Sequence, residues 1–290
     1  MTTILITGSN GQLGNEMQQA SKKHPRFNFL FTDVAELNIC DKVALSGYVQ
    51  SNQVNVIVNC AAYTAVDKAE DDAESCYRIN RDAVRNIGEV ANENNLKVVH
   101  VSTDYVFDGT NHIPYTENQP VCPATVYGKS KLAGEQVLLE TCSKAAIIRT
   151  SWLYSTFGSN FVKTMIKLGT ERDTLNVIFD QVGTPTYAAD LAEAILQLLA
   201  HDNFIPGIYH YSNEGVCSWY DFTKTIHRLA GITCNVQPIE TKDFPTRTPR
   251  PHYSVLNKAK IKSTYGISIS HWEESLEQCI GKLDLPKPVN

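Results

Sequence analysis

The chain has 290 residues, a formal net charge of −5, 42% hydrophobic residues and 20% charged residues. This length allows one large domain, or a large and a small domain that share a cleft. The ordinary composition and the mild negative charge, spread without long runs of either sign, argue against nucleic acid or an anionic membrane surface as the main partner.

No apolar run approaches the roughly 18 residues of a membrane span, and no basic, apolar leader precedes the first predicted strand. We therefore expect a cytoplasmic protein without a membrane partner. The eight cysteines include no C-x-x-C pair, and the eight histidines include no H-E-x-x-H pattern. We expect reduced cysteines and no bound metal.

Strand and helix patterns alternate through the first half of the chain, where short apolar runs predict strands and apolar spacings of three and four predict helices. The expected elements are a strand at 3–7, a helix from 13, strands at 27–32 and 54–59, one long helix over 70–94, a strand at 97–102, a helix over 126–141 and a strand at 146–149. This alternation predicts an α/β fold of the Rossmann type, a doubly wound parallel sheet covered by helices on both faces.

Beyond about residue 150 the alternation becomes looser. Helices are expected near 161–169, 188–200 and 219–230, between short strands and proline-bearing loops. We expect residues 1–150 to form a dinucleotide-binding domain and residues 151–290 to form mainly a smaller α/β substrate-binding lobe. Segments near 178–200 and 240–257 are expected to return to the first domain. The aperiodic stretch 104–125, with three prolines, predicts a functional loop at the rim of a site.

The first strand is followed by the motif Gly8-x-x-Gly11-x-x-Gly14 at the start of the first helix. Glycine at these positions permits a tight turn, close approach of the backbone to a pyrophosphate and close packing of helix on sheet. Asp33 ends the second strand 19 residues after Gly14, where a carboxylate accepts hydrogen bonds from ribose hydroxyls. The alternative is an ordinary turn and an unrelated surface aspartate. The pattern favours a dinucleotide site of the short-chain dehydrogenase type.

Tyr127 and Lys131 form a Y-x-x-x-K pattern at a predicted helix start, and the i, i+4 spacing places both on one face. Reduction of a ketone needs a proton for the carbonyl oxygen, and a phenol with a pKa of about 10 is a sluggish acid–base partner near neutrality. A lysine charge roughly 5 Å away is worth about 3 kcal/mol, or some two pKa units. The alternative is a solvated helix face. Thr103, at the end of the preceding strand, supports the catalytic interpretation because its hydroxyl can hold the same carbonyl oxygen.

Four segments resemble the dTDP-4-dehydrorhamnose reductase family. They are residues 59–70 (NCAAYTAVDKAE), 102–109 (STDYVFDG), 149–154 (RTSWLY) and 180–186 (DQVGTPT). The similarity extends from Ile4 to the helix after Trp272. It implies an NAD(P)H-dependent reductase that converts the 4-keto group of dTDP-4-dehydro-β-L-rhamnose to the alcohol of dTDP-L-rhamnose.

The resemblance also implies roles for individual residues. The cofactor loop would include Gly11, Gln12 and Leu13, with Asp33 at the ribose. Other cofactor contacts would be Asn38, Ile39, Ala62, Tyr63 and Thr64. Tyr127 and Lys131 would be the acid and its helper, and the substrate contacts would be Thr103, Asp104 and Trp152. Trp152 has a second interpretation as a core aromatic residue.

Two alternatives to this reductase stay open. Sugar-nucleotide dehydratases of this superfamily place an Asp-Glu pair after the strand-end threonine, whereas this chain has Asp104-Tyr105, which favours simple reduction. A related reductase or epimerase remains, including one that delivers hydride to the other face and gives the 6-deoxytalose product. The other alternative is a non-catalytic regulatory subunit of a methionine adenosyltransferase, against which the intact Thr103, Tyr127 and Lys131 argue.

The sequence also predicts cofactor choice and assembly. Asp33 would oppose a 2′-phosphate, and Val34 and Ala35 supply no guanidinium for one, so we expect NADH to be preferred and NADPH to be usable. Some family members form a dimer bridged by a divalent metal.

By alignment, Glu16 matches one ligand of that metal, but Ala189 and Lys282 stand at the other ligand positions, with Asp190 and Glu193 nearby. We expect Glu16 to be a solvated residue of the first helix, and the protein to be a metal-free monomer or weak homodimer.

Overall fold

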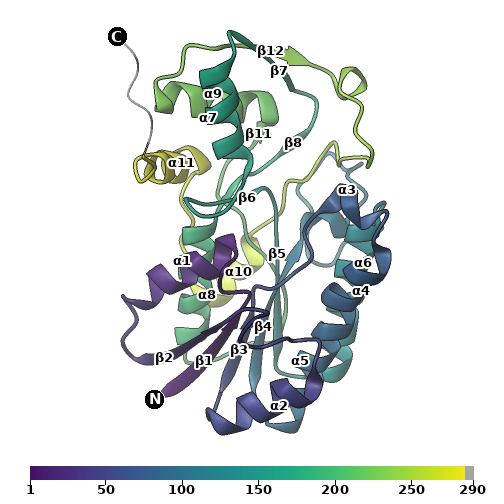
Figure 1. The fold of residues 1–290 in the computed structure, drawn as a ribbon, viewed down its shortest axis with the longest axis vertical. Coiled ribbons are helices and arrows are strands. Elements are labelled where there is room, and N and C mark those ends of the chain that lie inside the picture. Colours follow the sequence, from purple (N-terminus) through teal and green to yellow (C-terminus); the bar gives the residue numbers. More distant parts are fainter. Residues whose placement is uncertain (285–290) are drawn as a thin grey trace.

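In the computed structural model, which describes residues 1–284, six parallel strands form the central sheet in the order β10-β5-β4-β3-β1-β2 (Figure 1). In chain order the strands are β1 (Thr2–Thr7), β2 (Phe27–Thr32), β3 (Val56–Asn59), β4 (Lys97–Thr103), β5 (Ala145–Thr150) and β10 (Gly207–His210). Every neighbouring pair is parallel, so each connection crosses over a face of the sheet.

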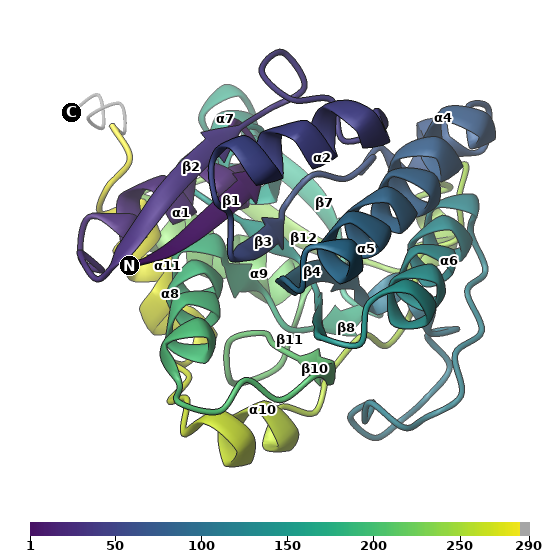
Figure 2. The same cartoon turned by 90° about the horizontal axis from the view of Figure 1, so that it is seen from below.

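Helices cover both faces of this sheet. Ile4 and Ile6 of β1 pack toward α1 (Gln12–Ser21) and α8 (Ala188–Ala200). Leu5 points to the other face, where the covering helices are α2 (Lys42–Ser51), α5 (Ala83–Glu93) and α6 (Val126–Thr141). Figure 2 shows α8 and α5 on opposite sides of the strands. The predicted doubly wound α/β fold is confirmed.

The single long helix expected over 70–94 is interrupted. The structure has α3 (Val66–Ala69), α4 (Ala73–Tyr77), a π-helical turn over Arg78–Asp82 and then α5. The buried amide of Asn80 in this turn donates to Ser130 Oγ of α6 at 3.0 Å and to the backbone oxygen of Tyr63. A Cβ on Gly134 would lie only 2.0 Å from the Asn80 oxygen. Close packing on α6 therefore accompanies the extra residue in the turn.

The sixth strand, β10, lies far along the chain and was not predicted, because four residues are too few for a periodic pattern. The loop after β4 contains a 3-10 turn over Asp104–Val106 and then runs without a helix or strand to α6, as its prolines suggested. None of the helices in residues 1–284 is long and apolar enough to cross a membrane.

The smaller lobe lies beyond the carboxyl ends of the strands (Figure 1). Its strands are β6 (Leu153–Tyr154), β7 (Thr174–Ile178), β8 (Val182–Gly183), β9 (Thr186–Tyr187), β11 (Cys217–Ser218) and β12 (Asn235–Ile239). Its helices are α7 (Phe161–Glu171), α9 (Trp219–Ala230) and α11 (Trp272–Ile280), whereas α10 (Ala259–Tyr265) contacts β10. The division of the chain near residue 150 remains a prediction, and residues 285–290 of the expected second lobe lie outside the described residues.

Candidate functional site

The glycine motif forms a cradle in which side chains have no room. Gly8 has a φ of +67°, and a Cβ there would lie 2.6 Å from the Ala61 nitrogen. A Cβ on Gly14 would lie 2.3 Å from the Gly8 oxygen, so this glycine allows the first turn of α1 to pack on the loop. Within the described chain no side chain caps α1 at Gly11. The helix therefore presents N–H groups and the positive end of its dipole to an anion.

A cavity of about 410 Å³ adjoins this cradle. The site residues predicted from the sequence that line it are Gly8, Gly11, Asp33, Asn38, Ile39 and Ala62. Asp33 Oδ2 accepts from the backbone N–H of Asn10 at 2.9 Å, which ties the end of β2 to the glycine loop. Arg78, the first residue of the π-helical turn, also lines this cavity. The sequence analysis missed it because it follows β2 by more than forty residues and belongs to no phosphate-binding motif.

A second cavity, of about 600 Å³, begins at the same loop and extends along the carboxyl ends of β4 and β5. It brings together ten of the residues predicted from the sequence, namely Gly11, Gln12, Leu13, Ala62, Thr64, Thr103, Asp104, Tyr127, Lys131 and Trp152. Gly14 and Tyr63 line neither cavity. The Tyr63 hydroxyl points to Asp72 at 3.3 Å instead, and Asn80 binds its backbone.

Thr125 caps α6 and thereby orients the Y-x-x-x-K pair, since its hydroxyl accepts from the Gly128 N–H at 2.9 Å. Both Tyr127 and Lys131 are buried, and Lys131 Nζ donates to the Val101 oxygen of β4 at 2.7 Å. Burial lowers the pKa of Lys131 to about 8, against the opposing effect of the Glu135 charge.

Burial also raises the pKa of Tyr127, with the Thr103 hydroxyl acting in the opposite direction. This direction is opposite to the one expected from the lysine charge alone. The physical reason is that loss of hydration penalises the phenolate, while the amine of Lys131 is directed at the backbone of β4. The buried phenol therefore holds its proton at neutral pH.

Thr103 and Asp104 stand where β4 ends. Thr103 Oγ1 donates to Asp104 Oδ1 at 3.0 Å and accepts from the Tyr105 N–H at 3.2 Å. Burial raises the pKa of Asp104 to about 7, and its Oδ2 has no hydrogen-bond partner within residues 1–284. Asp104 lines the second cavity and an adjoining third one. An unpartnered polar atom at this junction is available to a ligand.

The third cavity, of about 510 Å³, is largely aromatic. Trp152, half-buried, has a φ of +48° and stacks on Trp219 with 3.4 Å between ring centroids. Phe161 and Phe244 also line this cavity, as does Arg250, whose guanidinium binds Asp67 at 2.6 Å. Trp152 therefore faces open space rather than a closed core. Trp219 and Arg250 were not predicted, because no motif connects them with Trp152.

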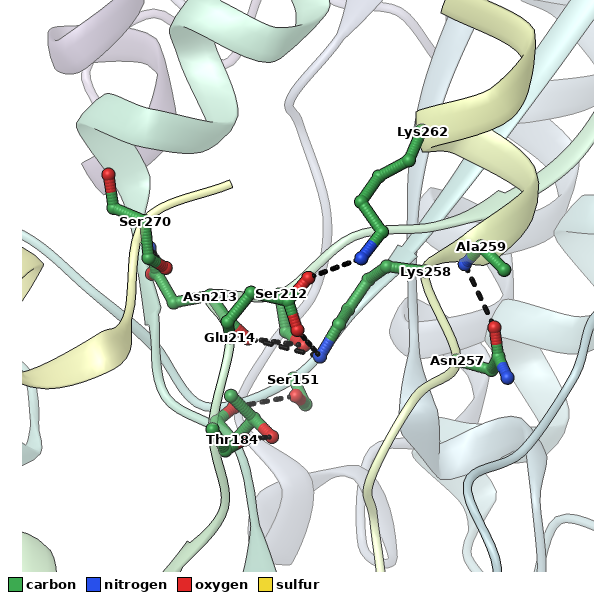
Figure 3. Close-up of polar contacts among 11 residues, drawn as sticks. Ser151, Thr184, Ser212, Asn213, Glu214, Asn257, Lys258, Ala259, Lys262 and Ser270 are labelled. Atoms are coloured by element: carbon green, nitrogen blue, oxygen red, sulfur yellow. Dashed lines mark hydrogen bonds and ion pairs between the residues drawn. The ribbon is translucent and has the colours of Figure 1, made fainter. Parts of the chain in front are cut away.

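The backbone around Trp152 is held from behind by polar contacts (Figure 3). Ser151 Oγ donates to the Thr184 oxygen at 2.8 Å, and Thr184 Oγ1 donates to the Gly215 oxygen at 2.8 Å. Next to this loop the buried Lys258 binds Glu214 at 3.3 Å. These contacts stabilise a positive φ that a tryptophan rarely adopts.

The residues considered for a bridging metal do lie together. Glu16, Ala189 and Lys282 line one hollow of about 340 Å³ with Asp190 and Glu193. The expectation that Glu16 is solvated is wrong. It is 4% exposed because residues of the small lobe cover it, and its Oε1 accepts from Ser155 Oγ at 2.7 Å.

These side chains do not fit a divalent cation. Asp190 accepts from Ser275 Oγ and Asn213 Nδ2, and Glu193 pairs with His24. The ammonium of Lys282 lies in the same hollow, where it would repel a cation. Within residues 1–284, no three His, Cys, Asp or Glu side chains are grouped to hold a metal.

Comparison with known proteins gives consistent matches over nearly the whole chain. The family model described as the RmlD substrate binding domain matches residues 1–285. The dTDP-4-dehydrorhamnose reductase of Aggregatibacter actinomycetemcomitans is 40% identical and the match covers 96% of this chain and 98% of that protein. The spore coat polysaccharide biosynthesis protein SpsK of Bacillus subtilis is also 40% identical, with 96% of each chain covered. The crystal structure of dTDP-4-dehydrorhamnose reductase from Bacillus anthracis in complex with NADP has a TM-score of 0.93 and 39% identity, and the match covers 97% of this chain and 100% of that one.

Proposed function

The chain belongs to the RmlD substrate-binding-domain family, which includes the dTDP-4-dehydrorhamnose reductases, and from this membership we propose how its site works as an NAD(P)H-dependent reductase. The substrate is a nucleotide-linked 4-keto-6-deoxy sugar, and the reaction is reduction of dTDP-4-dehydro-β-L-rhamnose to dTDP-L-rhamnose. A cytoplasmic location remains a prediction of the sequence.

The first two cavities would hold the cofactor. The cradle and the start of α1 suit its pyrophosphate, and Asp33 suits the adenosine ribose, with Asn38 and Ile39 beside the adenine. Ala62 and Thr64 line the continuation toward the second cavity. When bound there, NADH or NADPH supplies a hydride to the carbonyl carbon.

Tyr127 supplies the proton that the carbonyl oxygen needs when its carbon accepts a hydride. The raised pKa keeps the phenol protonated before reaction, and the charged Lys131 stabilises the phenolate that is left. The Thr103 hydroxyl holds the same carbonyl oxygen. Asp104 and Trp152 contact the sugar, since the open Oδ2 of Asp104 can bind a hydroxyl and the indole suits the deoxy carbon.

The observation that carries this proposal is that Thr103, Tyr127 and Lys131 line the same cavity as the glycine loop of α1. A non-catalytic subunit has no need for this arrangement. Incubation of the protein with NADH and dTDP-4-dehydro-β-L-rhamnose tests it, with NMR of the product to assign the configuration at C4. Absence of NADH oxidation would refute the reductase, and the 6-deoxytalose configuration would refute the rhamnose product.

We expect kcat/KM to favour NADH over NADPH by about tenfold, since a like-charge contact of Asp33 with a 2′-phosphate costs on the order of 1–2 kcal/mol. Arg78 in the same cavity offers that phosphate a counter-charge and explains why NADPH stays usable. Arg78→Ala should therefore lower kcat/KM for NADPH more than for NADH, and Asp33→Asn should reduce the preference for NADH. A wild-type preference for NADPH would show that Asp33 does not select the cofactor.

We expect EDTA to leave both the activity and the molecular mass in solution unchanged, because Lys282 and the internally bonded Glu16 and Asp190 oppose a cation. Light scattering and steady-state assays in matched buffers, with and without EDTA, measure this. A dimer that dissociates when metal is removed, and reforms when Mg²⁺ is returned, would contradict the proposed metal-free monomer or weak homodimer.

A further inference from the structure

A row of buried polar side chains crosses the sheet and ends at Lys131. Thr7 on β1, Asn59 on β3 and His100 on β4 are successive partners in the strand registers, and α6 brings Lys131 to the end of the row. Each of the four is at most 2% exposed. Because buried polar groups need hydrogen-bond partners, each bond in the row determines the orientation of the next group.

The hydrogen positions follow from one backbone group. The N–H of Ala61 can only donate, and it lies 3.1 Å from Asn59 Oδ1, which also accepts from Thr7 Oγ1 at 2.7 Å. The amide nitrogen of Asn59 must then be the atom that faces His100 Nδ1 at 3.0 Å. His100 Nδ1 is therefore an acceptor, and the neutral ring carries its proton on Nε2.

That Nε2 lies 3.4 Å from Lys131 Nζ. An N–H that points at an ammonium group is repelled by it, whereas an N–H that points at a neutral amine donates to its lone pair. Burial and the nearby Lys131 charge hold the pKa of His100 well below its usual value, so the ring stays neutral. His100 thus favours the uncharged form of Lys131.

Other groups act on Lys131 from the elements around it. Glu135, one turn further along α6, and Cys76 on α4 both favour the charged amine. Glu135 is itself paired with Arg149 of β5, and Tyr127 shares the helix face with Lys131. The protonation of Lys131 is a balance between these groups and His100.

We propose that His100 is a positioning residue, held by Asn59 with its Nε2–H toward Lys131, and that it sets the pH range in which Lys131 carries the charge that supports Tyr127. The kinetic consequence rests on the proposed function. Lys131 is charged below its pKa and loses its charge as pH rises through that value, so activity should fall on the alkaline side. Removal of the His100 donor raises that pKa and moves the alkaline limb to higher pH.

His100→Met tests this through the pH profile of kcat/KM for the sugar nucleotide at saturating NADH. We expect the alkaline limb to move up by at least about half a pH unit, with the Kd for NADH within about twofold of wild type. The matched control is His210→Met, since His210 is equally buried on β10 and binds the Tyr115 oxygen at 3.0 Å, and it should leave the limb in place. A limb that stays or moves down in His100→Met would overturn the proposal.

A second measurement needs neither the variant nor turnover. NMR of wild-type protein with isotope-labelled histidine side chains should show His100 protonated at Nε2 and bare at Nδ1. Its Nε2 signal should follow the titration of Lys131 and lose that response in Lys131→Met. A ring protonated at Nδ1 would overturn the inference, whereas failure of the proposed reduction would appear separately, as wild-type protein that oxidises no NADH with the keto sugar.

Discussion

Replacement of Tyr127 by phenylalanine is expected to lower kcat by about 10²- to 10⁴-fold, the contribution of a positioned general acid. The ring remains, so its packing in the cluster with Ala69 and Cys76 and the shape of the cavity should persist. The change removes only the hydroxyl that protonates the carbonyl oxygen. The cofactor contacts lie mainly at the glycine loop and the end of β2, so the Kd for NADH should stay within about twofold of wild type.

Single-turnover measurements with NADH and the keto-sugar nucleotide, together with NADH titration by fluorescence, separate these two effects. Tyr209→Phe is the matched control, because that tyrosine is buried in the sheet and its hydroxyl donates to the Ile205 oxygen at 2.8 Å. It should retain wild-type kcat. If Tyr127→Phe kept more than about a tenth of kcat, Tyr127 would not be the acid.

Glu135→Ala is expected to destabilise the protein by about 3–5 kcal/mol, the usual cost of removing one partner from a buried ion pair. Glu135 of α6 and Arg149 of β5 are 1% and 3% exposed, and their closest atoms are 2.6 Å apart. Ser102 of β4 also donates to Glu135, so one carboxylate joins three elements beneath the catalytic residues. Its loss leaves the Arg149 guanidinium buried without a counter-charge.

Urea unfolding followed by circular dichroism measures this loss. Glu240→Ala is the control, because Glu240 forms an ion pair of the same length with Lys242 at the surface and should cost less than about 1 kcal/mol. Glu135→Gln should be intermediate, since the amide keeps a hydrogen bond but not the charge. A cost below about 1 kcal/mol for Glu135→Ala would mean that Arg149 finds other compensation.

The sequence by itself determined the fold class and several neighbours in the site. Alternating strand and helix patterns require crossovers, and crossovers make a parallel sheet with covered faces. Gly8 and Asp33 were predicted to meet because both follow strand ends, and parallel strands end at one edge of a sheet. Tyr127 and Lys131 share a helix face because their spacing is close to one helical turn. In each case a local pattern implies the geometry.

The tertiary structure decided what no local pattern encodes. Arg78 reaches the adenosine side of the site through a π-helical turn, and Trp219 meets Trp152 across the small lobe. Glu16 became buried because Ser155, distant in the chain, covers it. The direction of the Tyr127 pKa changed with burial, and the orientation of His100 depends on a strand two crossovers away. Hydration, strand register and the direction in which a side chain points are set by contacts between distant segments, so spacing along the chain could not determine them.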